Sequence, residues 1–271
     1  MKKTALPKML SFSAPDLREQ IEALPEGTAL IGISTDGRAI AVDLDTDCPH
    51  VLVCTSTGGG STTVLRSLTA QFLHQGAHAL VLDAKRVSHP WARGLASVTY
   101  CADIADIHEA LVHLRAELSR RIHHIDQHGD TGDLTRLTVV FEVAHHTLTQ
   151  LARHWSKVRQ AGDPKTSPAV DAFHEVLYAG RAARIHVLYN GSTSGSLDPA
   201  IREHFATVIL ARVSAGTWQR LAPIAGPAPK SSAHPGRAHV VKDDIAHPTQ
   251  LLFMTDAEAA DWLAATAAGT I

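Results

Sequence analysis

The sequence is poor in features that would tie it to a membrane or to an oxidising environment. Its 271 residues include three cysteines, Cys48, Cys54 and Cys101, and no C-x-x-C pair. An odd number without paired spacing argues against a disulfide framework and favours small buried thiols in a reducing compartment. No apolar run approaches the roughly 20 residues that span a bilayer, so we expect a cytoplasmic protein without a membrane span.

The sequence also lacks a large excess of either charge and lacks two common catalytic motifs. The formal net charge is −2, so a surface that binds nucleic acid would have to be local. There is no H-E-x-x-H motif, and the neighbours His145 and His146 point apart on a helix or strand, which makes a poor chelate. There is no G-x-S-x-G motif either. An unrelated hydrolase therefore has little support, and a histidine base for water stays an open alternative.

Short apolar segments alternate with helical patterns along most of the chain. Such alternation predicts an α/β fold with a mostly parallel sheet and helices on both faces. The expected strands are 29–34, 39–43, 51–53, 79–83, 97–100, 138–142, 184–189, 206–211, 236–241 and 250–254. The expected helices are 16–24, 62–74, 104–125, 148–160, 169–179 and 256–267. We divide the chain into a leader with one short helix, residues 1–27, and one domain, residues 28–271.

The most informative stretch is PHVLVCTSTGGGSTTVLRSL at 49–68, which predicts a buried strand, a glycine-rich turn and a helix. This layout is typical of the P-loop G-x-x-x-x-G-K-[ST], but Thr55 replaces its first glycine and Ser61 its lysine. Its glycines let backbone N–H groups approach a phosphate at a helix N-terminus, unless they serve packing alone. The candidate nucleotide-binding residues are Thr57, Gly58, Gly59, Gly60, Ser61, Thr62 and Thr63, with Thr62 at the Mg²⁺-binding position.

A second apolar segment, LTVVFE at 137–142, ends in a carboxylate. In P-loop enzymes such a strand holds an acid near Mg²⁺, usually followed by a glutamate that activates water. Here Glu142 takes the first position, as a metal-binding and catalytic candidate, and Val143 takes the second. A valine cannot accept a proton from water. The plainer alternative is a buried strand that ends in a glutamate.

Together with further stretches, these motifs resemble the FtsK/SpoIIIE family of DNA-translocating P-loop ATPases over roughly residues 28–258. The further stretches are GRAIAVDLDTDCPHVLV at 37–53, VLDAKR at 81–86, RIHVLYN at 184–190 and IREHFATVILARVS at 201–214. The resemblance implies a RecA-like P-loop NTPase fold, ATP and Mg²⁺ as cofactors, sequence-independent binding of double-stranded DNA, and a homo-oligomer such as a hexamer. It also implies an arginine that reaches a neighbour's nucleotide. Arg202 is the candidate, and Arg181 and Arg184 are alternatives.

Three departures from the family's pattern fall in one site. Ser61 supplies no cation, Val143 supplies no base, and the usual polar sensor falls at 189–192, where Asn190 or Ser192 is the substitute. Loss of the cation weakens triphosphate binding and transition-state stabilisation. We therefore expect an ATP-binding and DNA-binding motor-type domain that is impaired in hydrolysis and linked to DNA translocation or mobile-element transfer. The alternative is a pseudo-ATPase that serves an active paralogue as a scaffold or regulatory subunit.

Other charged residues are candidates with plainer alternatives. Two basic groups would suit DNA phosphates, which carry most non-specific affinity, unless they are solvated helix faces. They are Lys157, Arg159 and Lys165, and Arg115, Arg120 and Arg121. Asp83 and Lys85 end a predicted strand at the edge where open α/β sheets bind ligands, unless they form an ordinary salt bridge.

Overall fold

One mixed sheet organises the chain. The computed structural model describes residues 8–193, 197–232 and 234–269. Within these ranges eleven strands form a sheet of order β3-β2-β11-β10-β9-β4-β8-β7-β5-β6, and β1 pairs with β11. The strands are β1 (Leu10–Ser11), β2 (Thr28–Ser34), β3 (Ala39–Asp43), β4 (His50–Thr55), β5 (His78–Leu82), β6 (Val98–Cys101), β7 (Leu137–Phe141), β8 (Ile185–Gly191), β9 (Thr207–Ala211), β10 (Arg237–Lys242) and β11 (Ile245–Phe253). From β9 across to β6 all neighbours are parallel, so the predicted α/β fold is confirmed.

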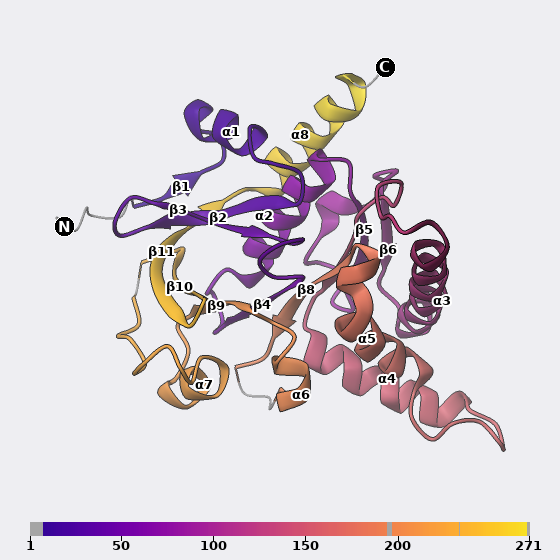
Figure 1. The fold of residues 1–271 in the computed structure, drawn as a ribbon. Coiled ribbons are helices and arrows are strands. Elements are labelled where there is room, and N and C mark those ends of the chain that lie inside the picture. Colours follow the sequence, from indigo (N-terminus) through magenta and orange to yellow (C-terminus); the bar gives the residue numbers. More distant parts are fainter. Residues whose placement is uncertain (1–7, 194–196, 233, 270–271) are drawn as a thin grey trace.

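Helices cover both faces of the sheet (Figure 1). They are α1 (Pro15–Glu22), α2 (Ser61–His74), α3 (Ile104–His128), α4 (Ala144–Val158), α5 (Pro168–Ala179), α6 (Pro199–Arg202), α7 (Ala215–Leu221) and α8 (Asp256–Gly269), with 3₁₀ turns η1 (Pro90–Ala92) and η2 (Gly180–Ala183). Val51 and Val53 of β4 pack into the core that α1, α2 and α8 share, whereas Leu52 and Cys54 pack towards α3, α4 and α5. A strand buried on both faces requires such an unbroken apolar run.

The antiparallel part of the sheet comes from both ends of the chain. The predicted hairpin forms β2 and β3, and the two predicted C-terminal strands form β10 and β11, which join it to β9. Prediction missed the short elements β1, α6 and α7, because two to seven residues carry little periodicity. Among the described residues, no helix combines the length and apolarity that a membrane crossing requires.

The segment predicted to be a leader packs against the other end of the chain. β1 pairs with β11, and the Phe12 ring lies 4.7 Å from the ring of Trp262 in α8. Leu17 and Ile21 of α1 are buried, and the Trp262 indole N–H donates a hydrogen bond to Glu22 over 2.9 Å. Residues 8–27 therefore contribute to the core, and the division at residue 27 stays a prediction.

The parallel strands place polar residues in one row at their carboxyl ends. Leu82, Phe141 and Tyr189 are register neighbours across β5, β7 and β8. The next residue of each strand or loop is therefore Asp83, Glu142 or Asn190, and all three lie at the edge where the turn after β4 begins. Ligands bind at this edge in open α/β sheets.

Candidate nucleotide-binding site

The turn between β4 and α2 has a shape that its glycines make possible. Gly58 and Gly60 have φ angles of 73° and 91°, in the left-handed region that side chains rarely adopt. Gly59 has an ordinary φ, but a Cβ there would lie 2.6 Å from the Thr55 Cβ and 2.7 Å from the Ser56 carbonyl oxygen. The three glycines therefore serve the turn itself, and the packing-only alternative does not account for Gly60, whose Cβ position is open.

The same turn is fixed at both ends. The Ser56 amide donates to the Ala211 carbonyl of β9 over 3.1 Å, and the Ser56 hydroxyl donates to the Arg212 carbonyl. On the other side α2 begins at Ser61, and residues 64–73 of this helix are buried. Gly60 is its N-cap and offers no side chain to the first-turn N–H groups. Such a helix start favours an anion, because those N–H groups have no partner within the helix.

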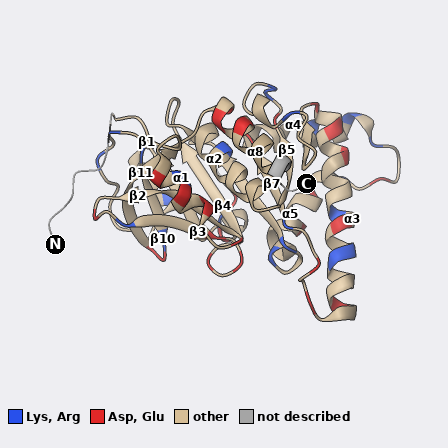
Figure 2. Ribbon diagram, turned by 90° about the horizontal axis from the view of Figure 1, so that it is seen from above, with Lys and Arg blue, Asp and Glu red and all other residues tan. Residues whose placement is uncertain are grey.

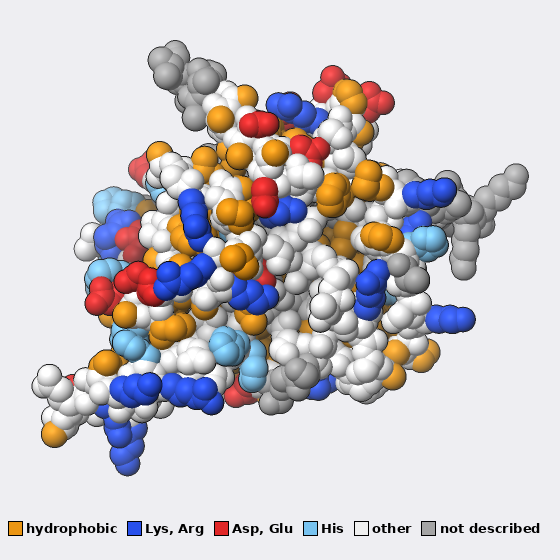
Figure 3. All heavy atoms as spheres, turned by 180° about the vertical axis from the view of Figure 1, so that it is seen from behind, with side chains coloured by type: hydrophobic (Ala, Val, Ile, Leu, Met, Phe, Trp, Pro, Cys, Tyr) orange, Lys and Arg blue, Asp and Glu red, His pale blue; other side chains and the backbone are white. Residues whose placement is uncertain are grey.

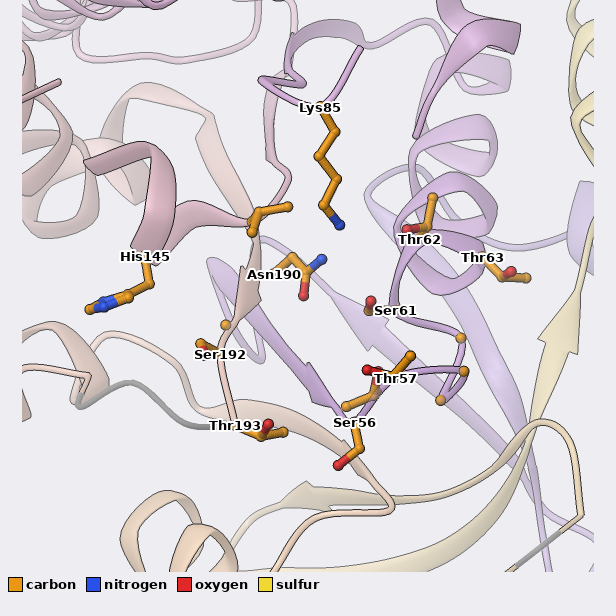
Figure 4. Close-up of a pocket in the computed structure, with 16 residues that line it drawn as sticks. Ser56, Thr57, Ser61, Thr62, Thr63, Lys85, His145, Asn190, Ser192 and Thr193 are labelled. Atoms are coloured by element: carbon orange, nitrogen blue, oxygen red, sulfur yellow. The ribbon is translucent and has the colours of Figure 1, made fainter. Parts of the chain in front are cut away.

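A cavity of about 460 Å³ opens above this turn (Figure 4). Its lining includes all seven predicted nucleotide-binding residues. The lining residues are Thr55, Ser56, Thr57, Gly58, Gly59, Gly60, Ser61, Thr62, Thr63, Lys85, Val143, His145, Asn190, Gly191, Ser192 and Thr193. The walls thus come from the ends of β4, β7 and β8 and from the loop after β5. The end of β4 at Thr55 and the end of β8 at Gly191 are 136 positions apart in the chain.

Glu142 lies beneath the cavity in a closed hydrogen-bond network. Its carboxylate is fully buried, and Oε1 accepts hydrogen bonds from the Asn190 amide at 2.7 Å and from the Thr62 hydroxyl at 3.2 Å. Oε2 lies 3.1 Å from His89 Nε2. Because the Trp91 indole donates to His89 Nδ1 over 3.3 Å, Nε2 carries the hydrogen and donates to Glu142. The structure thus joins the two predicted metal-binding residues, Thr62 and Glu142, by a hydrogen bond.

The stretch HPWARGLASVTYCAD at 89–103 also belongs to the family resemblance, but sequence reasoning gave His89 and Trp91 no role in the site. Both follow β5 in a loop that returns beneath Glu142, 53 positions away in the chain. The only signal was an apolar HPWA cluster in a polar loop. The loop is anchored by the buried Asp83, whose Oδ2 accepts from the Ser88 and His89 amides and from the Tyr100 hydroxyl.

Asp83 stays ionised because of those donors. Burial by itself would raise its pKa, but the hydrogen bonds from Tyr100 and from the two amides outweigh burial and lower the pKa. Its other oxygen, Oδ1, is buried and has no hydrogen-bond partner among the described residues. Asp83 does not line the cavity, so it positions the loop that carries Lys85.

Val143 and His145 line the cavity at the start of α4. Val143 has φ 49° and ψ 44°, a left-handed conformation that is unfavourable for a β-branched residue, and it serves as the N-cap of α4. His145 is exposed, and its ring points away from the turn in Figure 4. Val143 has no group that could accept a proton, and the His145 ring does not face the turn.

The arginines predicted to act on a neighbour's nucleotide are bonded within their own chain. Arg202 donates to the Leu221 carbonyl at 2.6 and 2.9 Å and to the Phe205 carbonyl at 2.7 Å, and burial lowers the pKa of its guanidinium. Arg181 donates to backbone carbonyls of the loop after β3, and Arg184 pairs with Glu26. None of the three lines the cavity. A different arginine, Arg212, lies beside the turn, with Nη1 3.6 Å from the position of a Gly58 Cβ.

The donor set suits a metal only in part. Within residues 8–193, 197–232 and 234–269, no three His, Cys, Asp or Glu side chains gather as a metal site. Thr62 and Glu142 fit Mg²⁺, which keeps most of its waters and uses few protein ligands beside substrate phosphates. They do not make a metal site without a phosphate.

The mostly parallel sheet and the glycine turn between β4 and α2 give this chain the architecture of a P-loop nucleotide-binding fold. No protein-family model matches it, and a comparison with curated proteins finds no match. Solved structures are similar. The pCW3 conjugation coupling protein TcpA, solved in a monomer form with ATPγS, superposes with a TM-score of 0.74 at 19% identity, over 97% of this chain and 75% of that chain.

The type VII secretion ATPase EccC and the ATPase EssC are also similar. The cytoplasmic domain of EccC from Thermomonospora curvata has a TM-score of 0.66 at 17% identity, over 92% of this chain and 28% of that one. ATPases 2 and 3 of EssC from Geobacillus thermodenitrificans give 0.69 at 17%, over 92% and 45%. This chain therefore spans less than half of the EccC chain and less than half of the EssC chain. The resemblance to FtsK/SpoIIIE-like coupling ATPases is confirmed, and at these identities it establishes the fold.

Proposed function

We propose that this chain is a nucleotide-binding P-loop domain of the FtsK/SpoIIIE type, impaired in ATP hydrolysis, that acts with double-stranded DNA in its movement or transfer. The observation that carries nucleotide binding is the glycine turn at the start of α2, with the hydroxyl of Thr62 bonded to Glu142. First-turn N–H groups fit a phosphate chain. Thr62 and Glu142 would hold Mg²⁺ beside it. The similarity to TcpA, which was solved with ATPγS, supports ATP as the nucleotide.

Impaired hydrolysis follows from the two sides of the cavity. Ser61 extends no charge towards the phosphates from the P-loop, and Val143 presents no group that accepts a proton. The missing charge at Ser61 removes transition-state stabilisation, and the missing base at Val143 removes general-base catalysis. General-base catalysis typically contributes about 10²- to 10⁴-fold in rate. ATP would therefore stay bound much longer than in a working motor.

Titration of the purified protein with a fluorescent ATP analogue and Mg²⁺ tests binding, and a turnover assay with and without DNA tests hydrolysis. We expect micromolar binding with a turnover close to background. The double variant Ser61→Lys/Val143→Glu should gain ATPase activity by at least about 10²-fold. Absence of nucleotide binding by both proteins would sink the proposal. Binding without any gain in turnover would instead favour the pseudo-ATPase scaffold, in which a bound nucleotide would stabilise a surface for an active paralogue.

The proposed DNA contact is the basic corner, which we define as Arg153, Lys157, Arg159 and Lys165. All four are exposed at the end of α4 and in the following loop, where Asp163 is the one acid. Figure 3 shows basic side chains gathered on this projecting corner, at its lower left. The Trp155 indole donates to the Pro164 carbonyl over 2.9 Å, which holds the loop against α4. A projecting set of unneutralised cations suits DNA phosphates.

The second predicted basic group is already neutralised. Arg120 and Arg121 pair with Glu117 one helical turn earlier, and Arg115 pairs with Glu175 of α5 over 2.7 Å. Figure 2 shows acidic and basic residues interleaved along α3. These arginines would have to break ion pairs to reach a phosphate, and Arg121 is also buried and donates to the Thr135 and Ala183 carbonyls, so we do not assign this group to DNA.

A matched pair of double variants tests the DNA assignment. Lys157→Gln/Lys165→Gln should lower the salt dependence of binding to a random DNA duplex by roughly 2 in log–log slope, because each lost phosphate contact removes about 0.9. Arg115→Gln/Arg120→Gln removes the same charge and should leave the slope unchanged. Equal effects of the two variants would contradict a local contact at the basic corner.

A further inference from the structure

The cavity lacks a cation on its P-loop but has one on the opposite wall. Of the described residues that line it, Lys85 is the one Lys or Arg. Lys85 follows β5 by three positions, and its side chain extends in Figure 4 towards the space above Ser61 and beside Thr62. Resting on the proposed function, we propose that Lys85 replaces the missing P-loop lysine and supplies the positive charge for the β- and γ-phosphates of a bound nucleotide.

The backbone around Lys85 is built to hold it there. The Arg86 amide donates to the Asp83 carbonyl over 2.9 Å, which closes a tight turn around Ala84 and Lys85. Arg86 itself is in the left-handed region with φ 68°, and its side chain pairs with Asp103. Asp83 ties the following residues to the same turn through the Ser88 and His89 amides. The base of Lys85 is therefore rigid, although the residue lies in a loop.

The ammonium group itself is held loosely. Lys85 Nζ lies 3.8 Å from Glu142 Oε1, the same oxygen that accepts from Thr62, and the Lys85 side chain is 54% exposed. An ion pair at this distance with one exposed partner contributes little to stability. A phosphate at the start of α2 would offer the ammonium a second, stronger acceptor, since lysine binds phosphate as a compact point charge. Glu142 would keep its hydrogen bonds from Thr62, His89 and Asn190 when Lys85 turns to the phosphate.

The arrangement also accounts for Ser61. A lysine at 61 would extend from the first residue of α2 into the same cavity that Lys85 enters from β5. In the absence of a nucleotide, two ammonium groups in this one cavity would repel each other. One cation from either wall is sufficient for charge balance, so the serine is compatible with a site that still binds a triphosphate.

If the positive charge has moved from position 61 to position 85, a lysine at either position should support binding of a triphosphate. Variants at both positions therefore test the proposal. Binding of fluorescent ATP and AMP analogues with Mg²⁺ would be measured for the wild type, Lys85→Met, Lys85→Arg and Ser61→Lys/Lys85→Met. Lys85→Met should weaken ATP-analogue binding by about tenfold or more and leave the AMP analogue within about twofold, since AMP has no β- or γ-phosphate for the ammonium to contact. Lys85→Arg should retain most of the affinity. Ser61→Lys should restore it in the Lys85→Met background to within about threefold.

Two controls separate this inference from the proposed function. Lys230→Met removes an exposed lysine elsewhere and should change nothing, and thermal unfolding of each variant checks that the fold is intact. Wild-type binding that survives Lys85→Met, a loss equal for ATP and AMP analogues, or a loss that Ser61→Lys does not reverse overturns the role of Lys85 and leaves nucleotide binding in place. Absence of binding by the wild type, with binding gained through Ser61→Lys alone, overturns it as well. A loss on Arg212→Met without one on Lys85→Met would assign the charge to Arg212.

Discussion

The two ends of the parallel strands both carry buried polar side chains, yet they differ in what those side chains face. At the carboxyl ends, Glu142, Asn190 and Thr62 form hydrogen bonds beneath an open cavity. At the amino ends, Arg136 bonds to Asp45 and to His186, and His186 in turn donates to the Pro49 carbonyl. In that second cluster the buried Arg136 and His186 take each other and their neighbours as hydrogen-bond partners, although the Asp45 side chain is 47% exposed.

The difference shows that buried polar groups alone do not mark a binding site. At the amino ends they satisfy one another and fix the entry of the strands. At the carboxyl ends they leave groups available to a ligand: the first-turn N–H groups of α2 and the exposed ammonium of Lys85. Substitutions at the amino ends should change the free energy of unfolding, and substitutions at the carboxyl ends should change the affinity for the ligand. Measuring both quantities separates the structural role from the binding role.

The largest expected difference between the ends is in their response to acid. Burial lowers the pKa of His50 to about 4, and burial and the Arg136 charge lower the pKa of His186 to about 3, from the ordinary 6.5. Below pH 6.5 these two histidines become protonated in the unfolded chain but stay neutral in the folded chain, so the free energy of unfolding falls as pH falls. The two histidines together should cost about 3 kcal/mol between pH 6.5 and pH 5.

At the carboxyl end the pH window is lower. The pKa of Asp83 is depressed below its ordinary 3.8, so its contribution is present above that value and is lost only as pH falls further. Urea unfolding from pH 7.5 to pH 4.5 measures the slope. Asp83→Asn should lower the free energy of unfolding at every pH from 7.5 to 4.5 and leave its slope against pH unchanged. A free energy of unfolding that is flat from pH 6.5 to pH 5 would contradict the neutral, buried state of the two histidines.

The next largest effect concerns the turn. Gly59→Ala places a methyl group within 2.6–2.7 Å of Thr55 and Ser56, so the turn must shift and its N–H groups move out of line. Loss of one or two hydrogen bonds to a charged phosphate should weaken ATP-analogue binding by about 100-fold. Gly216→Ala is the matched control, because the nearest atom to its Cβ is 3.9 Å away. Equal affinities of the two variants would show that the turn does not hold the nucleotide.

A substitution at the amino ends should do the reverse. Arg136 is buried, and Arg136→Met would leave His186 and the partly exposed Asp45 without their donor. We expect the free energy of unfolding to fall by about 2 kcal/mol, with ATP-analogue affinity unchanged within about twofold. Arg120→Met, which removes an exposed ion pair with Glu117, should cost less than about 0.5 kcal/mol. A change in nucleotide affinity on Arg136→Met would mean that the two ends are coupled.

Periodicity and motif spacing were sufficient to predict the fold and the centre of the cavity. Apolar runs gave the strands, and the glycine turn after one of them gave the start of α2, because these signals are local. The pairing of Arg120 and Arg121 with Glu117 was also readable from helix spacing. The partner of Arg115 was not, since Glu175 belongs to another helix.

The rest of the site depends on which loops cross the sheet edge. His89 reaches Glu142 only because β5 and β7 are neighbours in the sheet, and no local pattern states that order. The role of Arg202 towards a neighbour's nucleotide stays a prediction, and what the sequence did not reveal is that its guanidinium donates to the carbonyls of Phe205 and Leu221. Direction and hydrogen-bond partners of a long side chain are properties of packing, and a sequence motif does not contain them.

The smallest predicted effect tests whether the carboxyl end stores strain that the amino end lacks. Val143 holds a left-handed conformation at the cavity, at a cost of about 1 kcal/mol relative to a residue that tolerates it. Val143→Asn should therefore raise the free energy of unfolding by up to about 1 kcal/mol, because asparagine adopts this conformation more readily. Val158→Asn, at an exposed helical position of α4, is the control and should give no gain. If urea unfolding finds the two variants alike, Val143 is not strained, and its place beside the cavity reflects packing alone.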